Sequence, residues 1–132
     1  MPERYPFDYA VVRVVPRVER GELVNAGVIL SSQEARFLGA LVELDEARVL
    51  ALDPRADLEE IRRCLEAIPV ICAGGKDAGP IGRLPQRARF NWLVAPRSTI
   101  VQTSPAHGGL CTDPASQLEK LFKKLVTTDP HR

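Results

Sequence analysis

Residues 7–30 of the chain read FDYAVVRVVPRVERGELVNAGVIL. Two segments of this stretch, Phe7 to Val15 and Leu23 to Leu30, are rich in valine, isoleucine and aromatic residues. The segment between them, Arg17 to Glu22, is charged and contains a glycine. This order of residues predicts two antiparallel strands that are joined by a turn. A third strand, from about Arg36 to Glu43, would complete a meander of three strands.

The register of the first two strands follows from the alternation of side chains, because a shift of one residue moves every side chain to the other face. With Val14 opposite Val24, one face is entirely apolar and should be buried. That face carries Val12, Val14, Val24, Ala26 and Val28. The other face is mixed and places Arg13 opposite Asn25. A mixed face of this kind is typical of the solvated or site-bearing side of an antiparallel sheet.

Two helices are predicted after the meander. Asp45 can cap a short helix that runs through Leu52. Asp57 can cap the second helix, because Asp57-Leu58-Glu59-Glu60 has the spacing of a capping box with Asp in place of Ser. Pro69 should kink or end the second helix, because proline has no N–H and its ring clashes with the preceding turn.

The second half of the chain predicts a helix from Gln86 to Val94, a strand from Thr99 to Thr103 and a final helix. Asp113 and Pro114 have the residue types of an N-cap and a first helical position, and apolar residues follow at helical spacing. Residues 1–132 should therefore form one α+β domain. In it, the meander and the fourth strand form an antiparallel sheet that is packed on one face by helices. The helical side of the core should include Leu65, Ile68, Leu121 and Leu125.

Composition and length favour an ordinary globular protein. The 132 residues are 45% hydrophobic and 27% charged, which is enough apolar material for a core without disulfide bonds. No apolar run approaches the ~20 residues that span a bilayer, and the N-terminus lacks the pattern of a secretory signal. The three cysteines have irregular spacing, which argues against a disulfide framework or a zinc site. We therefore expect a cytoplasmic protein with free thiols, no metal, no cofactor and no membrane association.

Positive charge is concentrated in one segment. Between Asp77 and Asp113, 35 residues contain no acidic side chain and hold four arginines. These are Arg83, Arg87, Arg89 and Arg97. They contribute +4 to a chain whose formal net charge is +1, so the rest of the chain carries −3. Such a segment indicates an anionic partner or, equally, a solvated surface.

Polar residues in this segment and on the mixed sheet face are candidates for a binding site. Arginine binds carboxylates and phosphates in a bidentate manner, and Trp92 could stack on a base. We expect Arg97 and Ser98 to line one concave, positively charged surface together with Arg13 and Asn25. In the alternative, the arginines pair with acidic side chains while Trp92 packs on the sheet. The full set of candidates is Arg13, Asn25, Arg87, Asn91, Arg97, Ser98, Gln102 and His107.

His107 and Cys111 stand four residues apart and could supply a base and a nucleophile. The segment around them contains one proline and two glycines and reads as a loop, so no element holds the pair in place. A turn residue and a buried thiol are the plainer interpretation. The run from Ala73 to Pro80 contains glycines and a lysine, but it lacks the residue order of a phosphate-binding loop.

Three runs of the sequence stand out: YAVVRVVPR at 9–17, NAGVIL at 25–30 and FNWLVAPRSTIVQTSP at 90–105. Together they resemble a bacterial family catalogued as domain of unknown function 3037, and the resemblance covers nearly the whole chain. That family has no established activity, so the resemblance implies neither a reaction nor catalytic residues. The gene setting of some members implies an accessory role beside serine kinases of the Hip type.

Three functions follow from these observations. The first is a non-enzymatic accessory protein that binds another protein, with a Hip-type serine kinase as a candidate partner. The second is the binding of single-stranded nucleic acid, or of a phosphorylated or other anionic ligand, through the arginines. The third is a small hydrolase or transferase centred on His107. A homodimer is compatible with all three.

Overall fold

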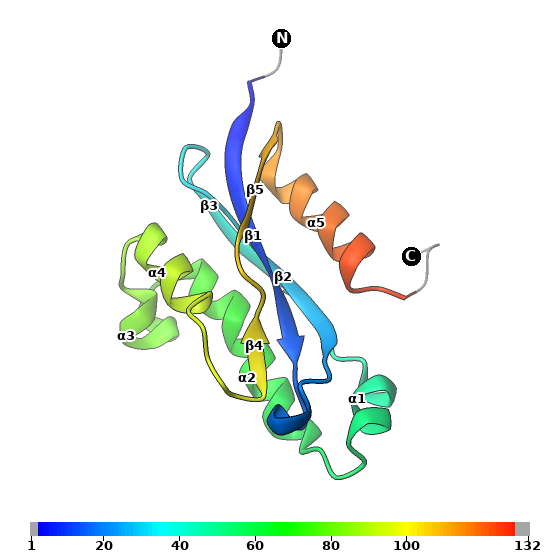
Figure 1. Cartoon of the computed structure of the whole chain (residues 1–132). Coiled ribbons are helices and arrows are strands. Elements are labelled where there is room, and N and C mark those ends of the chain that lie inside the picture. The colour runs from blue at the N-terminus through cyan, green and yellow to red at the C-terminus, as the bar shows by residue number, and fades with distance from the viewer. Residues whose placement is uncertain (1–2, 129–132) are drawn as a thin grey trace.

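The computed structural model describes residues 3–128 and shows an antiparallel sheet with helices packed against it (Figure 1). The strands are β1 (Tyr5–Val14), β2 (Val24–Ser32), β3 (Phe37–Val42), β4 (Val101–Thr103) and β5 (His107–Cys111). The helices are α1 (Glu46–Leu52), α2 (Leu58–Ala73), α3 (Gly79–Gly82), α4 (Gln86–Leu93) and α5 (Pro114–Leu125). Two short 3-10 turns are η1 (Val18–Arg20) and η2 (Lys76–Ala78). This confirms the α+β class and the predicted meander of β1, β2 and β3.

The long strand β1 organises the sheet. β2 pairs with one side of β1, and β3 continues the sheet beyond β2. On its other side, β1 pairs through its C-terminal part with β4 and through its N-terminal part with β5. The sequence did not predict β5, whose residues were expected in a loop. Its glycines and exposed side chains lack the alternation of a half-buried strand, so pairing with β1 is what makes it a strand.

A β-bulge changes the predicted register of β1 and β2. The C-terminal end of β1 pairs with β2 as expected, but Val12 then lies opposite Gly27 instead of Ala26. One extra residue in β2 reverses the direction of the side chains that follow it. Ala26 therefore packs on one side of the sheet and Val28 on the other, whereas the sequence had placed them on one face.

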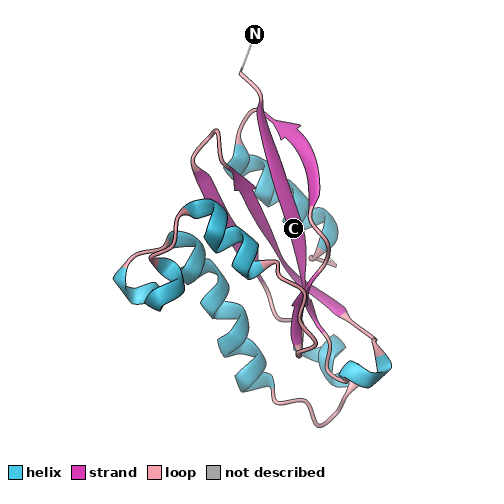
Figure 2. Cartoon of the chain, turned by 60° about the vertical axis from the view of Figure 1, so that its left-hand side comes forward, coloured by secondary structure: helices cyan, strands magenta, loops and turns pink. Residues whose placement is uncertain are grey.

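Helices cover both faces of the sheet instead of the single face that was predicted (Figure 2). One buried cluster joins the sheet to α1, α2 and α4, and it includes Val12, Ile29, Leu65 and Phe90. A second cluster joins the opposite face to α5, and it includes Phe7, Val28, Leu30 and Leu118. The reason is visible in β2, where Val28, Ile29 and Leu30 are consecutive and buried, so both faces of this strand are apolar.

The predicted helical core is therefore divided between two layers. Leu65 and Ile68 belong to the cluster beneath α2. Leu121 and Leu125 pack at the margin of the cluster beneath α5, where Leu118 is the more deeply buried leucine.

Local signals for the helix starts are confirmed. The Asp45 carboxylate accepts a hydrogen bond from the backbone N–H of Arg48 at 3.1 Å, and Asp57 accepts one from Glu60 at 3.1 Å. Asp113 accepts one from Ala115, also at 3.1 Å. Each side chain satisfies a backbone N–H that has no partner within its own helix, which is why the three helices begin where they do.

Pro69 does not end α2, which continues to Ala73. Buried residues stand on both sides of the proline, Ile68 before it and Cys72 after it, and both belong to the cluster beneath the sheet. Their burial offsets the one backbone hydrogen bond that the proline removes. Within residues 3–128, no helix is long and apolar enough to cross a bilayer.

Candidate functional site

A hollow of the described surface lies between α2 and the segment that connects α4 to β4. We call it the α2–β4 groove; its volume is about 620 Å³, and its walls are mostly apolar. This volume is in the range of ligand-binding clefts, roughly 300–1,000 Å³. From α2 it is lined by Glu60, Ile61, Cys64, Ala67, Ile68 and Ile71, and across it by Trp92, Leu93 and residues 97–103, with Val18 at one end.

Arg97 holds the rim of the groove at the end of α4. Its guanidinium donates hydrogen bonds to the backbone carbonyls of Trp92 and, at 3.3 Å, of Leu93. The same guanidinium stacks on the Trp92 ring, with its central carbon 4.4 Å from the ring centroid. A cation is favoured at the C-terminus of a helix, where carbonyls lack intrahelical partners. Arg97 therefore shapes the groove as well as lining it, and Trp92 remains 40% exposed beside it.

The same wall carries polar groups from β4 and the loop before it. Gln102 donates to the Thr99 carbonyl at 2.7 Å, and Thr99 donates to the Val101 carbonyl at 2.8 Å, so this loop is held in shape by its own side chains. Thr103 also lines the groove, but its hydroxyl is buried and has no hydrogen-bond partner among the described residues. Ser98 is exposed on the same rim.

Arg13 and Asn25 do not join Arg97 and Ser98 on one surface, and that expectation is corrected. Arg13 lies opposite Asn25 in the sheet, as predicted, but neither residue lines the groove. Asn25 donates a hydrogen bond to the carbonyl of Leu125 at 3.0 Å and so ties β2 to the end of α5. The neighbours of Arg13 along β1 point toward α2, so the alternation of the strand directs Arg13 to the α5 side.

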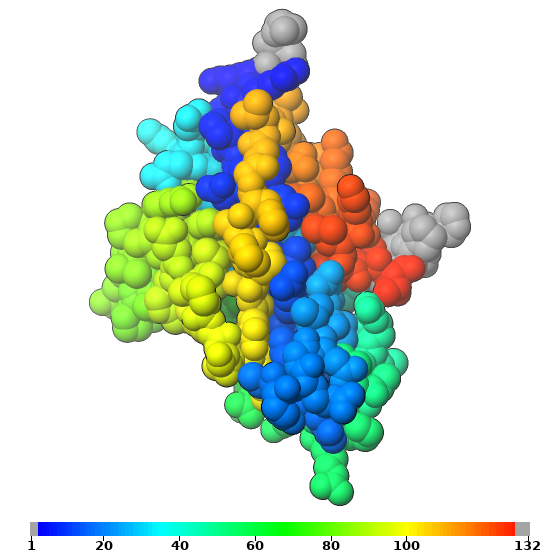
Figure 3. Space-filling model, in the orientation of Figure 1, coloured from blue at the N-terminus to red at the C-terminus, as the bar shows by residue number. Residues whose placement is uncertain are grey.

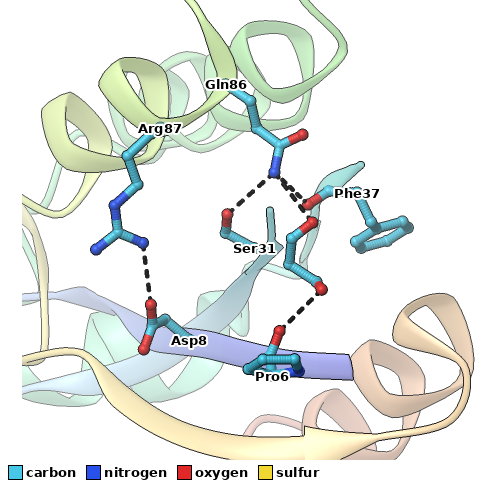
Figure 4. Close-up of polar contacts among 7 residues, drawn as sticks. Pro6, Asp8, Ser31, Phe37, Gln86 and Arg87 are labelled. Carbon is cyan, nitrogen blue, oxygen red and sulfur yellow. Dashed lines mark hydrogen bonds and ion pairs between the residues drawn. The ribbon is translucent and has the colours of Figure 1, made fainter. Parts of the chain in front are cut away.

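The other arginines of the acid-free segment are mostly engaged within the protein. Arg87 forms an ion pair with Asp8 at 3.0 Å (Figure 4). Arg89 donates to three backbone carbonyls, those of Leu84 at 2.9 Å, Ile71 at 3.1 Å and Cys72 at 2.6 Å. Arg89 thereby joins the end of α2 to the loop before α4. Much of the positive charge that the sequence concentrates here holds α4 in place.

Gln86 fixes the start of α4 on the sheet, and sequence reasoning did not single it out. Its amide nitrogen lies within hydrogen-bonding distance of Ser31 Oγ (3.4 Å), Ser32 O (3.2 Å) and Phe37 O (3.0 Å) (Figure 4). Asn91, which was a candidate, is exposed on the same helix. Sequence reasoning also missed the α2 wall of the groove. The sequence feature that could have indicated this wall is the pair of small residues Cys64 and Ala67, which flank the apolar stripe of α2.

His107 and Cys111 stand at opposite ends of β5. Four residues of a strand span about 13 Å at ~3.3 Å per residue, so the imidazole and the thiol are beyond hydrogen-bonding reach. The His107 ring instead packs against Tyr9, with ring centroids 5.5 Å apart. Burial, and to a smaller extent Asp113, raises the pKa of the Cys111 thiol. His107 and Cys111 therefore do not form a Cys–His pair for nucleophilic catalysis within one chain.

The three thiols should differ in reactivity. Cys64 is exposed in the groove, whereas burial raises the pKa of Cys72 to about 12 and also raises that of Cys111. A raised pKa lowers the thiolate fraction at any pH below it, and only the thiolate reacts. We expect a thiol reagent at pH 8 to modify one cysteine rapidly in the folded protein and the other two only in denaturant. Peptide mapping should identify it as Cys64; a fast reaction at Cys72 would contradict the assignment of α2.

Across residues 3–128, no group of three or more His, Cys, Asp or Glu side chains is placed to hold a metal ion.

Comparisons with curated proteins and with solved structures find no match. The model of one protein family, by contrast, matches residues 9–126 of the 132-residue chain. That span includes every strand except the first residues of β1, and it includes both walls of the groove. The chain therefore belongs to the family described as Protein of unknown function (DUF3037).

Proposed function

We propose that the protein is a non-enzymatic accessory protein that binds an apolar segment of another protein in the α2–β4 groove. The observation that carries this proposal is the groove itself, a cleft of about 620 Å³ with mostly apolar walls. Apolar surface that stays open to water favours a partner that covers it.

The composition of the rim suits a protein ligand. Trp92 and Arg97 are the residue types that dominate binding energy at protein interfaces, and here they stack on one another. Ile100 and Val18 add further apolar surface that is 38% and 40% exposed.

A serine kinase of the Hip type is the first partner to test, because the family resemblance implies such a gene setting. In this role the chain would need no catalytic group of its own. It would recognise an apolar segment of the kinase and leave the reaction to it.

Filling the groove should abolish partner binding without affecting the fold. Ala67 is exposed on α2 and lines the groove, so Ala67→Trp would occupy the space of the ligand. Titration calorimetry with the purified kinase should show binding weakened at least about tenfold, which is 1.4 kcal/mol. The matched control is Ala47→Trp, at an exposed position of α1 outside the groove, which should bind as the unmodified chain does.

Protection of Cys64 gives a second readout of the same site. A partner in the groove should slow the alkylation of this thiol, which lines the α2 wall. A kinase that binds with unchanged affinity to Ala67→Trp, or that leaves Cys64 fully reactive, would show that the groove is not its site. Arg97→Glu is a poorer test, because Arg97 also holds the end of α4 through the Trp92 and Leu93 carbonyls.

An anionic ligand, either phosphorylated or a single-stranded nucleic acid, is the second candidate. The observation in its favour is that Arg97, Ser98 and Gln102 line the groove next to the half-exposed Trp92, on which a base could stack. Binding of this kind should weaken steeply as salt is raised, whereas burial of an apolar segment should not. A salt series with an oligonucleotide and with the kinase separates the two candidates.

A further inference from the structure

β5 is the least covered strand of the sheet. Residues 107–110 are all exposed, and only Cys111 is buried. Leu110 is 61% exposed, the highest value for a large apolar side chain in the described part of the chain. Helix α5 packs mainly on β2 and β3, and of β5 only Cys111 belongs to the cluster beneath this helix. Figure 2 shows β5 as the outermost strand on its side of the sheet, and Figure 3 shows the segment from β4 to β5 running along the surface.

The outer edge of β5 carries none of the usual protection against pairing. Edge strands are commonly guarded by lysine or other charged side chains, by a proline within the strand, or by a covering helix. Residues 104–112 read SPAHGGLCT and contain no Lys, Arg, Asp or Glu, and the proline precedes the strand. Among residues 3–128, β5 pairs only with β1, so no described strand occupies its outer edge. If β5 of a second copy paired with this edge, no charged side chains of the same sign would stand opposite one another, because residues 104–112 carry none.

The two glycines of β5 have different explanations. A Cβ at Gly109 would lie 2.8 Å from the Phe7 ring, so any larger residue would force this buried ring to shift, and packing within the chain explains the glycine. A Cβ at Gly108 would meet its nearest neighbour, an Asp8 carboxylate oxygen, at 3.6 Å, which is an ordinary contact. The fold of one chain therefore leaves Gly108 unexplained.

Antiparallel pairing of two β5 strands explains it. With Gly109 on the two-fold axis, Leu110 of one copy stands opposite Gly108 of the other, and both lie on the same face. The leucine side chain would cover the bare backbone at Gly108 and lose its own exposure to water. In this register His107 faces Cys111 of the second copy.

We propose that the protein forms a homodimer in which the two β5 strands pair about Gly109 and join the two sheets into one. Such an interface is isologous, so each copy contributes the same strand and the assembly closes at two. The α2–β4 groove lies outside the paired strand and stays open in the dimer. This inference is therefore independent of the proposed function.

A charge on the paired strand should dissociate the dimer. We expect sedimentation equilibrium of the full chain, at concentrations up to about 100 μM, to show dimers, and Leu110→Lys to weaken dimerisation at least tenfold. The matched control is Val70→Lys, which replaces an apolar side chain that is 45% exposed on α2 and should leave the dimer intact. Far-UV circular dichroism and the melting temperature of the diluted monomer check that both variants fold. A wild-type chain that stays monomeric throughout, or a Leu110→Lys chain that dimerises as tightly as the wild type, overturns the proposal.

Mixed cross-linking tests the register. In a Cys64→Ser background, Gly108→Cys and Leu110→Cys are prepared as separate proteins, so that the new thiols face one another only across the two-fold axis. Oxidation of the mixture should yield a disulfide-linked heterodimer in much higher yield than oxidation of either protein alone. Equal yields in all three samples would overturn the register about Gly109, and no cross-link in any sample would overturn the pairing of β5.

Discussion

Replacing Phe90 by Ala should lower the free energy of unfolding by about 3–5 kcal/mol, the usual cost of removing a fully buried aromatic ring. Phe90 is 1% exposed and belongs to the cluster between the sheet, α1, α2 and α4. Its ring is the largest fully buried side chain of the described residues, and Arg87 lies over it, 5.4 Å from the ring centroid. The loss should therefore be among the largest of any single truncation in this protein, because the surrounding elements cannot collapse into the cavity without moving α4.

Denaturant unfolding followed by circular dichroism measures this change. The matched control is Trp92→Ala, which also truncates an aromatic ring on α4 but at a position that is 40% exposed. Its cost should be about 1 kcal/mol, mainly from the loss of the stack with Arg97. If the two variants were equally stable, α4 would not pack on the sheet through Phe90 as described.

Gly27→Ala should destabilise the protein by about 1–3 kcal/mol or more, although it adds a single methyl group. A Cβ at this position would lie 2.7 Å from the carbonyl oxygen of Leu41 and 2.9 Å from a methyl carbon of Val42. The first of these atoms is backbone in the neighbouring strand β3, so a change of side-chain rotamer cannot relieve the contact. The glycine follows the bulge, where β2 and β3 approach closely.

Gly108→Ala is the matched control, since it makes the same change in another strand of the same sheet. The nearest atoms to a Cβ at Gly108 are 3.6 and 3.7 Å away, so we expect the stability of the monomer to change by less than about 0.5 kcal/mol or to rise slightly. Thermal melts at concentrations below dimer formation allow the comparison. A Gly27→Ala chain as stable as the control would show that β2 and β3 can separate at the bulge.

The physical role of the family-like run NAGVIL becomes clear from these contacts. Asn25 ties β2 to the end of α5, and Gly27 allows the close approach of β3. The apolar residues after it fill both layers of the core. The run FNWLVAPRSTIVQTSP supplies the buried anchor Phe90 and then one wall of the groove. The run NAGVIL therefore builds the sheet, and the run FNWLVAPRSTIVQTSP connects the fold to the candidate site.

Elements whose signals are local could be predicted from the sequence. The caps at Asp45, Asp57 and Asp113 act on backbone N–H groups two or three residues away, so the helix starts depend on few other residues. The strands β1, β2 and β3 are long enough for their β-branched residues to be recognised without knowledge of their partners. Arg97, Ser98 and Gln102 were recognised as polar residues in one run, and they do line one groove.

Features that depend on contacts between distant segments could not be predicted in this way. The direction of Arg13 depends on which face of β1 packs on α2, and the face of Val28 depends on one extra residue in β2. The partners of Arg87 and Arg89 are an acidic side chain 79 residues away and the carbonyls at the end of another helix. For this reason a segment that reads as a charged surface contains arginines that hold α4 in place.

Periodicity, capping residues and composition were thus sufficient for the α+β class, the meander and the final helix, because each reflects short-range geometry of the chain. Three features required the folded protein: the strand β5, the division of the core into two layers, and the groove between α2 and β4. β5 has almost no apolar alternation and exists through hydrogen bonds to β1, while the layers and the groove arise where helices distant in sequence meet the two faces of one sheet. Burial and backbone pairing between distant residues are properties of the packed chain, and no window of the sequence contains them.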